Sequence, residues 1–347
     1  MNKVDYIVVG QGLAGSCLAL EFLKRKIKFV VIDKFNPQSA SQIAAGVFNP
    51  ITGRTNQATW KASEIFPALH SFYLDAEKLL KSKFLFELSI YRPFLSEHES
   101  GKWPNETNAW IKEISQKSKY GETVNDPFGG IEINHGGFLK TQKFLKAVRN
   151  LLIGAECLQA EQFNFNQLEV GEPIKYKSLS ADKIIFCDGV DALTNPFFHW
   201  LPIRKLKGEL LTTKAALPKD TIINRGIFSV PSEENEWVIG STYYHNDAPG
   251  LNPEKINDMH NRSTILFKVP IEISQTQWGH RPTTIDRRPI LGSHPTQKNV
   301  CLFNGLGTKG VSLAPFFAVH LADWLNDKTE LQREVNIARF YSLLLKS

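Results

Sequence analysis

The sequence predicts an α/β fold with a second, largely antiparallel region inserted into it. At the N-terminus, a β-branched run at 5–9, a glycine-rich loop, a short apolar helix and a strand at 29–33 follow one another within about thirty residues, the usual length of a β-α-β crossover. Near the other end, an apolar strand at 300–303 precedes a glycine cluster and another apolar helix. Between these segments, 208–213 and 237–242 have the composition of antiparallel strands bounded by polar turns.

The chain length suits two domains, because single hydrophobic cores stop growing at roughly 250–300 residues and this chain has 347. We predict one discontinuous α/β domain over residues 1–55, 136–200 and 278–347. The intervening residues, 56–135 and 201–277, are predicted to form an α+β domain built on an antiparallel sheet.

Composition and charge limit the class of protein. The hydrophobic share of 42% and the charged share of 22% are close to globular averages. The net charge of +6 leaves room for an anionic ligand, but the basic residues are dispersed, so we do not expect a nucleic-acid partner. The apolar segment 311–325 contains His320 and Asp323 and is too short to span a bilayer. Four cysteines without C-x-x-C spacing are expected to be reduced thiols of a cytoplasmic protein.

The spacing of Gly10, Gly12 and Gly15 between a strand and a helix is the pattern that binds a dinucleotide pyrophosphate. The phosphates then lie at the helix N-terminus, where free N–H groups favour negative charge. Asp33 ends the second strand and is placed to accept hydrogen bonds from a ribose. The alternative is a glycine-rich turn in an unrelated α/β protein. The loop therefore predicts a Rossmann-like dinucleotide domain, but it does not distinguish FAD from NAD.

Four further stretches decide between the two nucleotides. They are 41–50 (SQIAAGVFNP), 181–189 (ADKIIFCDG), 278–292 (WGHRPTTIDRRPILG) and 304–315 (NGLGTKGVSLAP). In this order they resemble the motifs of the D-amino-acid oxidase (DAO) family, from the loop that approaches the flavin ring to the loop that closes over its pyrimidine. Within that family they are most similar to glycine oxidases and to the flavin domain of the bacterial enzyme that modifies carboxymethylaminomethyl-uridine in tRNA.

The resemblance implies a Rossmann-like FAD-binding domain with an inserted substrate domain. It implies oxidation of the C–N bond of a small amine or amino acid by hydride transfer to flavin N5, with oxygen or another acceptor taking the electrons. Non-covalent FAD is expected, because Cys301 lies within a strand rather than in the closing loop. The resemblance places cofactor contacts on Gly10, Gly12, Leu13, Ala14, Gly15, Asp33, Lys34, Ser41, Ala44, Ala45, Gly46, Val47, Phe163, Cys187, Asp188, Gly189, Arg281, Gly305, Leu306, Gly307, Thr308, Lys309 and Gly310.

Three side chains are candidates for the chemistry. The resemblance places Arg281 where amino-acid-oxidising relatives bind the substrate carboxylate, and a guanidinium can pair bidentately with a carboxylate; a structural salt bridge is the alternative. Lys309 suits the negative charge that accumulates near flavin N1 on reduction, unless it is an ordinary surface lysine. Glycine oxidases carry a tyrosine where Phe228 stands, and phenylalanine cannot donate that hydrogen bond. Tyr243 or Tyr244 could replace it, and Tyr243 is the third candidate.

Other functions stay open at this point. A 2-hydroxy-acid dehydrogenase that shares this FAD domain needs a base, and His280 is the candidate. A tRNA-modifying oxidoreductase would place a basic surface against phosphates, and a non-catalytic flavin-binding protein is a further alternative. No group of histidine, cysteine and aspartate residues has metal-site spacing in the sequence, so no metal is expected.

Overall fold

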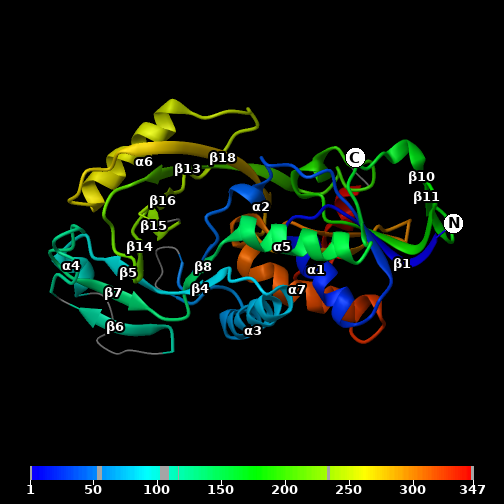
Figure 1. Ribbon diagram of the computed structural model, residues 1–347, viewed down its shortest axis with the longest axis horizontal. Coiled ribbons are helices and arrows are strands. Elements are labelled where there is room, and N and C mark those ends of the chain that lie inside the picture. The colour runs from blue at the N-terminus through cyan, green and yellow to red at the C-terminus, as the bar shows by residue number, and fades with distance from the viewer. Residues whose placement is uncertain (1, 53–56, 102–108, 116, 233–234, 345–347) are drawn as a thin grey trace.

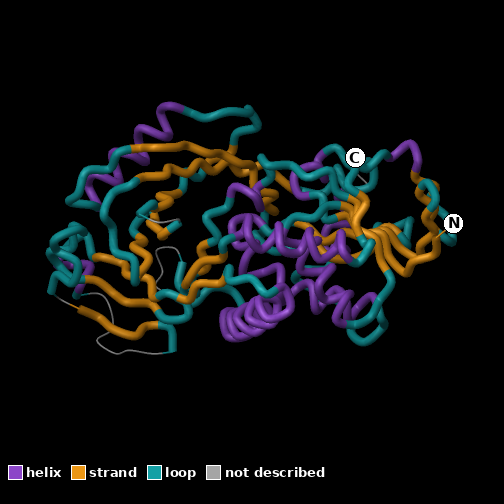
Figure 2. The backbone as a smooth tube through the Cα atoms, in the orientation of Figure 1, coloured by secondary structure: helices purple, strands orange, loops and turns teal. Residues whose placement is uncertain are grey.

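Two large sheets occupy the two ends of an elongated molecule (Figure 1). The computed structural model describes residues 2–52, 57–101, 109–115, 117–232 and 235–344. Helices gather around the first sheet, whereas strands make up most of the second (Figure 2).

The first sheet contains the predicted parallel strands. β1 (Asn2–Val9) pairs in parallel with β2 (Phe29–Ile32) and β12 (Leu179–Phe186), and β12 pairs in parallel with β20 (Val300–Asn304). The other strands are β9 (Leu158–Gln159), β10 (Leu168–Glu169), β11 (Ile174–Tyr176) and β19 (Ile290–Ser293). The order is β10-β11-β12-β1-β2-β9, and β20 pairs with both β12 and β19.

Side chains of β1 alternate between two cores, one on each face of this sheet. Tyr6 and Val8 are buried with apolar residues of four helices, whereas Ile7 and Val9 are buried on the other face with aromatic residues that include Phe186. The four helices are α1 (Leu13–Lys24), α3 (Ala62–Leu80), α5 (Thr141–Gly154) and α7 (Gly310–Leu325). Parallel strands covered on both faces have continuous apolar sequences, which is why this strand could be predicted from a short run.

The second sheet is antiparallel apart from the parallel pair β5 and β14. Its order is β17-β13-β16-β15-β14-β5-β7-β6, and β18 pairs with β13. α6 (Pro253–Leu266) covers one face of this sheet, where Met259 packs in a core with Leu211 and Ile239 (Figure 1). The strands are β5 (Ser89–Pro93), β6 (Ile111–Ser115), β7 (Gly130–Ile133), β13 (Ile203–Thr213), β14 (Thr221–Asn224), β15 (Phe228–Pro231), β16 (Trp237–Gly240), β17 (Tyr244–His245) and β18 (Ile273–Thr284).

The pairing of β13 with β18 decides which side chains share a face. Leu206 lies opposite Arg281, and Lys207 lies opposite His280. Because successive side chains of a strand point to opposite faces, Leu206, Gly208 and Arg281 share one face of the pair. Lys207 and His280 share the other face.

A small third sheet lies between the two large ones in Figure 1 and contains β3 (Val47–Phe48), β4 (Leu85–Glu87) and β8 (Gly137–Leu139). The helices α2 (Ala40–Ile43) and α3 (Ala62–Leu80) belong to the same region of the chain, and α4 (Glu97–Ser100) and α8 (Tyr341–Leu344) are short.

The α/β fold with an antiparallel second sheet is confirmed. The domain boundaries given above stay a prediction, and the one at residues 55 and 56 lies outside the described residues. In the described ranges, no helix combines the length and the apolar character that crossing a membrane requires.

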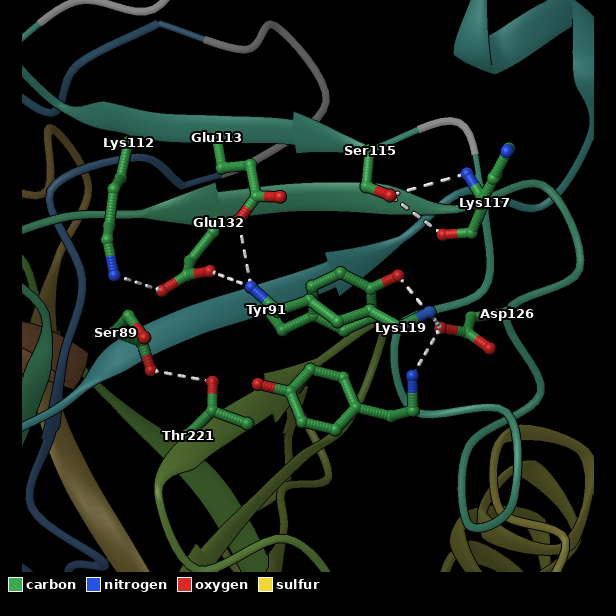
Figure 3. A network of polar contacts seen from close by, with 11 residues as sticks. Ser89, Tyr91, Lys112, Glu113, Ser115, Lys117, Lys119, Asp126, Glu132 and Thr221 are labelled. Carbon is green, nitrogen blue, oxygen red and sulfur yellow. Dashed lines mark hydrogen bonds and ion pairs between the residues drawn. The ribbon is translucent and has the colours of Figure 1, made fainter.

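A network of polar side chains connects β5, β6 and β7 of the second sheet with the segment that follows β6 (Figure 3). The buried carboxylate of Asp126 accepts hydrogen bonds from the Tyr91 hydroxyl at 2.9 Å and from the Lys119 backbone N–H at 2.8 Å. Burial opposes ionisation of Glu132, but hydrogen bonds from Lys119 and Lys112 lower its pKa to about 2. Because the carboxylate of Glu132 pairs with Lys112 and Lys119, this network has a structural role. It holds the segment after β6 against the sheet.

Candidate active site

Two glycines of the loop, Gly10 and Gly15, pack so closely against backbone that they admit no side chain. A Cβ on Gly15 would lie 1.9 Å from the carbonyl oxygen of Gly10. A Cβ on Gly10, whose φ is +100°, would lie 2.6 Å from the carbonyl oxygen of Cys187. α1 therefore begins directly after the turn, with Gly12 as its N-cap. The first N–H groups of a helix lack partners within it and bind phosphate well, so the loop has the geometry of a pyrophosphate cradle.

Two distant segments contact this loop. Ser41 of α2 accepts a hydrogen bond from the Leu13 N–H through its Oγ at 3.1 Å. At the start of α7, a Cβ on Gly310 would lie 3.1 Å from Cδ1 of Leu13. Thr283 of β18 forms an isolated bridge with Leu306. The structure thus brings together the glycine loop, the segment after β2, the closing loop and the strand that carries Arg281.

Polar side chains at or just after the ends of β2, β12 and β20 form hydrogen bonds along the carboxyl edge of the first sheet. Oδ1 of Asp33 accepts a hydrogen bond from the Gln11 N–H at 3.0 Å. Asp188 accepts hydrogen bonds from Nδ2 of Asn195 at 2.8 Å and from Nδ2 of Asn304 at 2.9 Å. Burial raises the pKa of Asp188 to about 7, although both hydrogen bonds act against the rise. Ligands of open α/β sheets bind at this edge.

The other predicted cofactor residues range from fully buried to exposed. The ring of Phe163 packs in the second core, 4.6 Å from the Tyr176 ring centroid. Gly46 is buried, and a Cβ there would lie 1.9 Å from the Leu139 carbonyl oxygen. The half-buried residues are Ala44, Ala45, Val47, Gly189 and Gly307, and the exposed ones are Lys34 and Thr308.

The guanidinium of Arg281 is enclosed between β13 and the turn after β16. Gly208 lies beneath it, and a Cβ at Gly208 would be 1.9 Å from Nη2. Nη2 donates to Oγ of Ser241 at 3.0 Å, and Nη1 donates to the carbonyl oxygens of Lys207 and Thr242 at 3.4 and 3.5 Å. Burial lowers the pKa of Arg281 to about 10, so the group is charged at neutral pH. It has no carboxylate partner in the part of the chain that the structure describes, and its fork is suited to one.

Glu209 anchors the turn that contacts Arg281. It is fully buried, and its carboxylate accepts hydrogen bonds from the Thr242 hydroxyl at 2.9 Å, the Tyr244 hydroxyl at 3.1 Å and the Asn252 N–H at 2.7 Å. The Thr242 oxygen in turn accepts the Glu209 N–H at 2.7 Å. These bonds fix the segment that presents a hydroxyl and a carbonyl to Arg281.

Of the two candidate tyrosines, Tyr243 is the one with a free hydroxyl among the described contacts. Tyr244 donates to Glu209, whereas Tyr243 is 54% exposed and close enough to Arg281 to affect its pKa. Phe228 of β15 lies opposite Gly240, which in turn lies opposite Leu210 of β13. Opposite residues of neighbouring strands share a face, so the Phe228 ring lies on the face that carries Arg281.

Lys309 is a half-buried cation at the N-terminal end of α7. Burial lowers the pKa of its ammonium group, and the nearby charges of Arg288 and Arg287 lower it further. The Arg288 guanidinium lies 4.1 Å from the Trp60 ring centroid. Among the described residues, the ammonium group has no hydrogen-bond or ion-pair partner. Its charge adds to the positive end of the α7 dipole.

His280 points away from Arg281, to the opposite face of β18. Its Nε2 is buried without a partner in the described part of the chain, and burial lowers its pKa, with further lowering from Lys205 and Lys207. The ring packs against Trp278, 5.2 Å between centroids. This position counts against His280 as the base of a hydroxy-acid dehydrogenase.

A protein-family model described as FAD dependent oxidoreductase, DAO, matches residues 5–324. The chain belongs to the DAO family. It is therefore an FAD-dependent oxidoreductase, and the dinucleotide left open by the glycine loop is FAD.

This DAO-family chain is similar to longer proteins and to solved structures. It is 24% identical over 350 residues to the bifunctional protein ThiO/ThiG of Trichormus variabilis, covering 92% of this chain and 52% of that protein. It is 26% identical over 319 residues to the tRNA 5-methylaminomethyl-2-thiouridine biosynthesis bifunctional protein MnmC of Leptospira borgpetersenii, covering 82% and 47%. The chain thus spans about half the length of these curated relatives. The crystal structure of glycine oxidase from Geobacillus kaustophilus has a TM-score of 0.79 at 18% identity and covers 98% of both chains.

The site of this DAO-family chain fits FAD. Because Gly10 and Gly15 lack side chains, the turn packs directly against the Cys187 backbone and closes on itself, which leads the chain straight into the N-terminus of α1, where a pyrophosphate binds in this type of fold. Asp33 follows β2, where the adenosine ribose is bound in this type of fold. The closing loop, with Lys309, meets both the glycine loop and β18.

The sequence did not point to several residues that build this site. Gly208, Glu209 and Ser241 arrange the surroundings of Arg281, and Asn304 holds Asp188. Gly208 carried a usable signal, because a glycine inside a strand often marks a close approach of another group. The others depend on strand register, which the sequence does not give.

Proposed function

We propose that this chain oxidises the C–N bond of a small amine that bears a carboxylate, such as a simple amino acid. The observation that carries this proposal is the enclosed guanidinium of Arg281, which keeps its charge and lacks a carboxylate partner among the described residues. A buried cation that only neutral oxygens contact is costly unless a ligand pairs with it. The relative named glycine oxidase supports an amino acid as substrate class.

Each side chain then has a defined task. Arg281 binds the carboxylate bidentately and so fixes the carbon that bears the amine. Ser241 and the Thr242 carbonyl orient the guanidinium. In this proposal, the exposed Tyr243 donates a further hydrogen bond to the bound carboxylate. Lys309 holds positive charge at the closing loop. FAD, when bound, accepts the hydride from the substrate carbon.

The experiment is anaerobic reduction of the bound flavin, followed by its absorbance, with matched small molecules. Glycine and methylamine differ by the carboxylate, and glycine and glycolate differ by the amine. We expect reduction by glycine or by sarcosine, no reduction by glycolate, and at least about 100-fold slower reduction by methylamine. Reduction by glycolate and not by the amino acids would replace the proposal with hydroxy-acid oxidation.

A further inference from the structure

Arg149 of α5 connects the glycine loop to the acidic residue after β2. Its Nη1 donates to Oδ2 of Asp33 at 2.8 Å and to Oε1 of Gln11 at 3.1 Å, and its Nη2 donates to the Asp33 carbonyl oxygen at 3.2 Å. Its Cζ also lies 5.7 Å from the centroid of the Phe35 ring. The Arg149 and Asp33 side chains are only 16% and 19% exposed, so solvent screens this ion pair incompletely.

Gln11 ties the same cluster into the core. Its Nε2 donates to Oγ of Ser16 at 3.1 Å and to the carbonyl oxygen of Leu145 at 3.0 Å. Gln11 lies inside the glycine loop, Ser16 in α1 and Leu145 in α5. The orientation of the loop is therefore linked to α5 through one amide and one guanidinium.

The hydrogen bonds of Asp33 leave little of its carboxylate free. An ionised carboxylate offers about four acceptor positions. Oδ1 uses one for the Gln11 N–H, and Oδ2 uses two for Arg149 and for the Phe35 N–H at 2.8 Å. One position is left, on Oδ1, so this carboxylate in this arrangement accepts one ribose hydroxyl rather than two.

We propose that Arg149 is a positioning residue for FAD: it holds Asp33 so that the free position of Oδ1 faces one hydroxyl of the adenosine ribose. Arg149 acts on the cofactor through Asp33. Without the guanidinium, Oδ2 loses a charged donor, and the carboxylate can turn to other partners. The affinity for FAD then falls, and so does the preference for a ribose over a deoxyribose in the adenosine half.

The experiment measures dissociation constants of the apoprotein by quenching of flavin fluorescence. The ligands are FAD and its analogues with 2′-deoxy- or 3′-deoxyadenosine. The variants are R149M, R149K, D33N and the double variant D33N/R149M. K146M is the matched control, because Lys146 is an exposed cation on the same helix.

We expect R149M to weaken FAD binding roughly 10- to 100-fold, K146M to change it less than about twofold, and R149K to fall between them. The double variant should bind about as weakly as D33N alone, because both changes interrupt one interaction. In the wild type, one deoxy analogue should bind about tenfold more weakly than FAD, and this ratio should shrink below about threefold in R149M.

If Arg149 had only a structural role, R149M would lower the affinity for all three ligands equally. The ratio of the affinities for FAD and for the deoxy analogue would then stay unchanged, and this result would overturn the proposal. Additive effects of D33N and R149M overturn it as well. If R149M does not fold, the ratio in R149K decides in the same way. None of these readouts depends on substrate oxidation.

Discussion

The guanidinium of Arg281 lies directly over Gly208, where a Cβ would come within 1.9 Å of Nη2. The atom that meets this Cβ is the end of a long side chain, so we expect Gly208→Ala to displace the guanidinium rather than unfold the protein. The variant should weaken binding of a carboxylate ligand such as acetate about tenfold or more, measured by the change in the flavin spectrum. Gly154→Ala is the control, since a Cβ at Gly154 meets nothing within 4 Å. Equal carboxylate affinity in both variants would contradict this geometry.

Glu209→Gln tests the support of Arg281 from the opposite face. The carboxylate oxygens of Glu209 accept three hydrogen bonds, one at Oε2 and two at Oε1. An amide replaces one of these oxygens with an NH2 group, which brings a donor against a donor. We expect the unfolding free energy to fall by about 1–3 kcal/mol, measured by urea unfolding, together with weaker acetate binding. Thr242→Val should weaken acetate binding as well, whereas an unchanged affinity in both variants would show that the turn keeps its position without Glu209.

Lys309→Met tests the role of the closing loop. Loss of a half-buried positive charge destabilises the reduced flavin, which carries negative charge. The two-electron midpoint potential should become more negative by roughly 30–60 mV, measured by dye-coupled reduction. Lys24→Met, at the exposed end of α1, is the control and should leave the potential unchanged. A shift of the same size in both variants would indicate a general charge effect.

Asp188 predicts a pH dependence of stability. Its pKa is raised from 3.8 to about 7 in the folded protein. The folded state therefore keeps a proton that the unfolded state releases, so this residue makes stability fall as pH rises from about 4 to 7. Asp188→Asn removes that loss, and its melting temperature relative to the wild type should be higher at pH 8 than at pH 5. A difference between the two proteins that does not change with pH would show that Asp188 titrates normally.

The parallel part of the fold was predictable because its signals are local. The β-branched run before Gly10, the spacing to Gly15 and the acid at Asp33 all lie within one crossover, and the structure places them as β1, α1 and the end of β2. The short strands β4 and β8 could not be predicted in the same way, since two or three residues carry no periodicity.

The candidate site was predictable only in part, for a physical reason. Arg281 and Lys309 belong to motifs that resemble a known family, so their positions could be named from sequence. Glu209 and Arg149 act through pairings between distant segments, such as β13 with β17 and α5 with the glycine loop. Strand register and helix rotation decide those pairings, and neither is written in a local pattern.

We propose above all that Arg281 binds the carboxylate of an amine substrate. The most direct measurement is the rate of anaerobic flavin reduction by glycine and by methylamine in the wild type and in Arg281→Met. The quantity compared is the rate constant of flavin reduction divided by the dissociation constant of the substrate. We predict that Arg281→Met lowers this ratio roughly 100-fold for glycine. The ratio for methylamine should change little, so that the preference for a substrate with a carboxylate disappears. A variant that keeps the wild-type preference for glycine over methylamine would contradict the account.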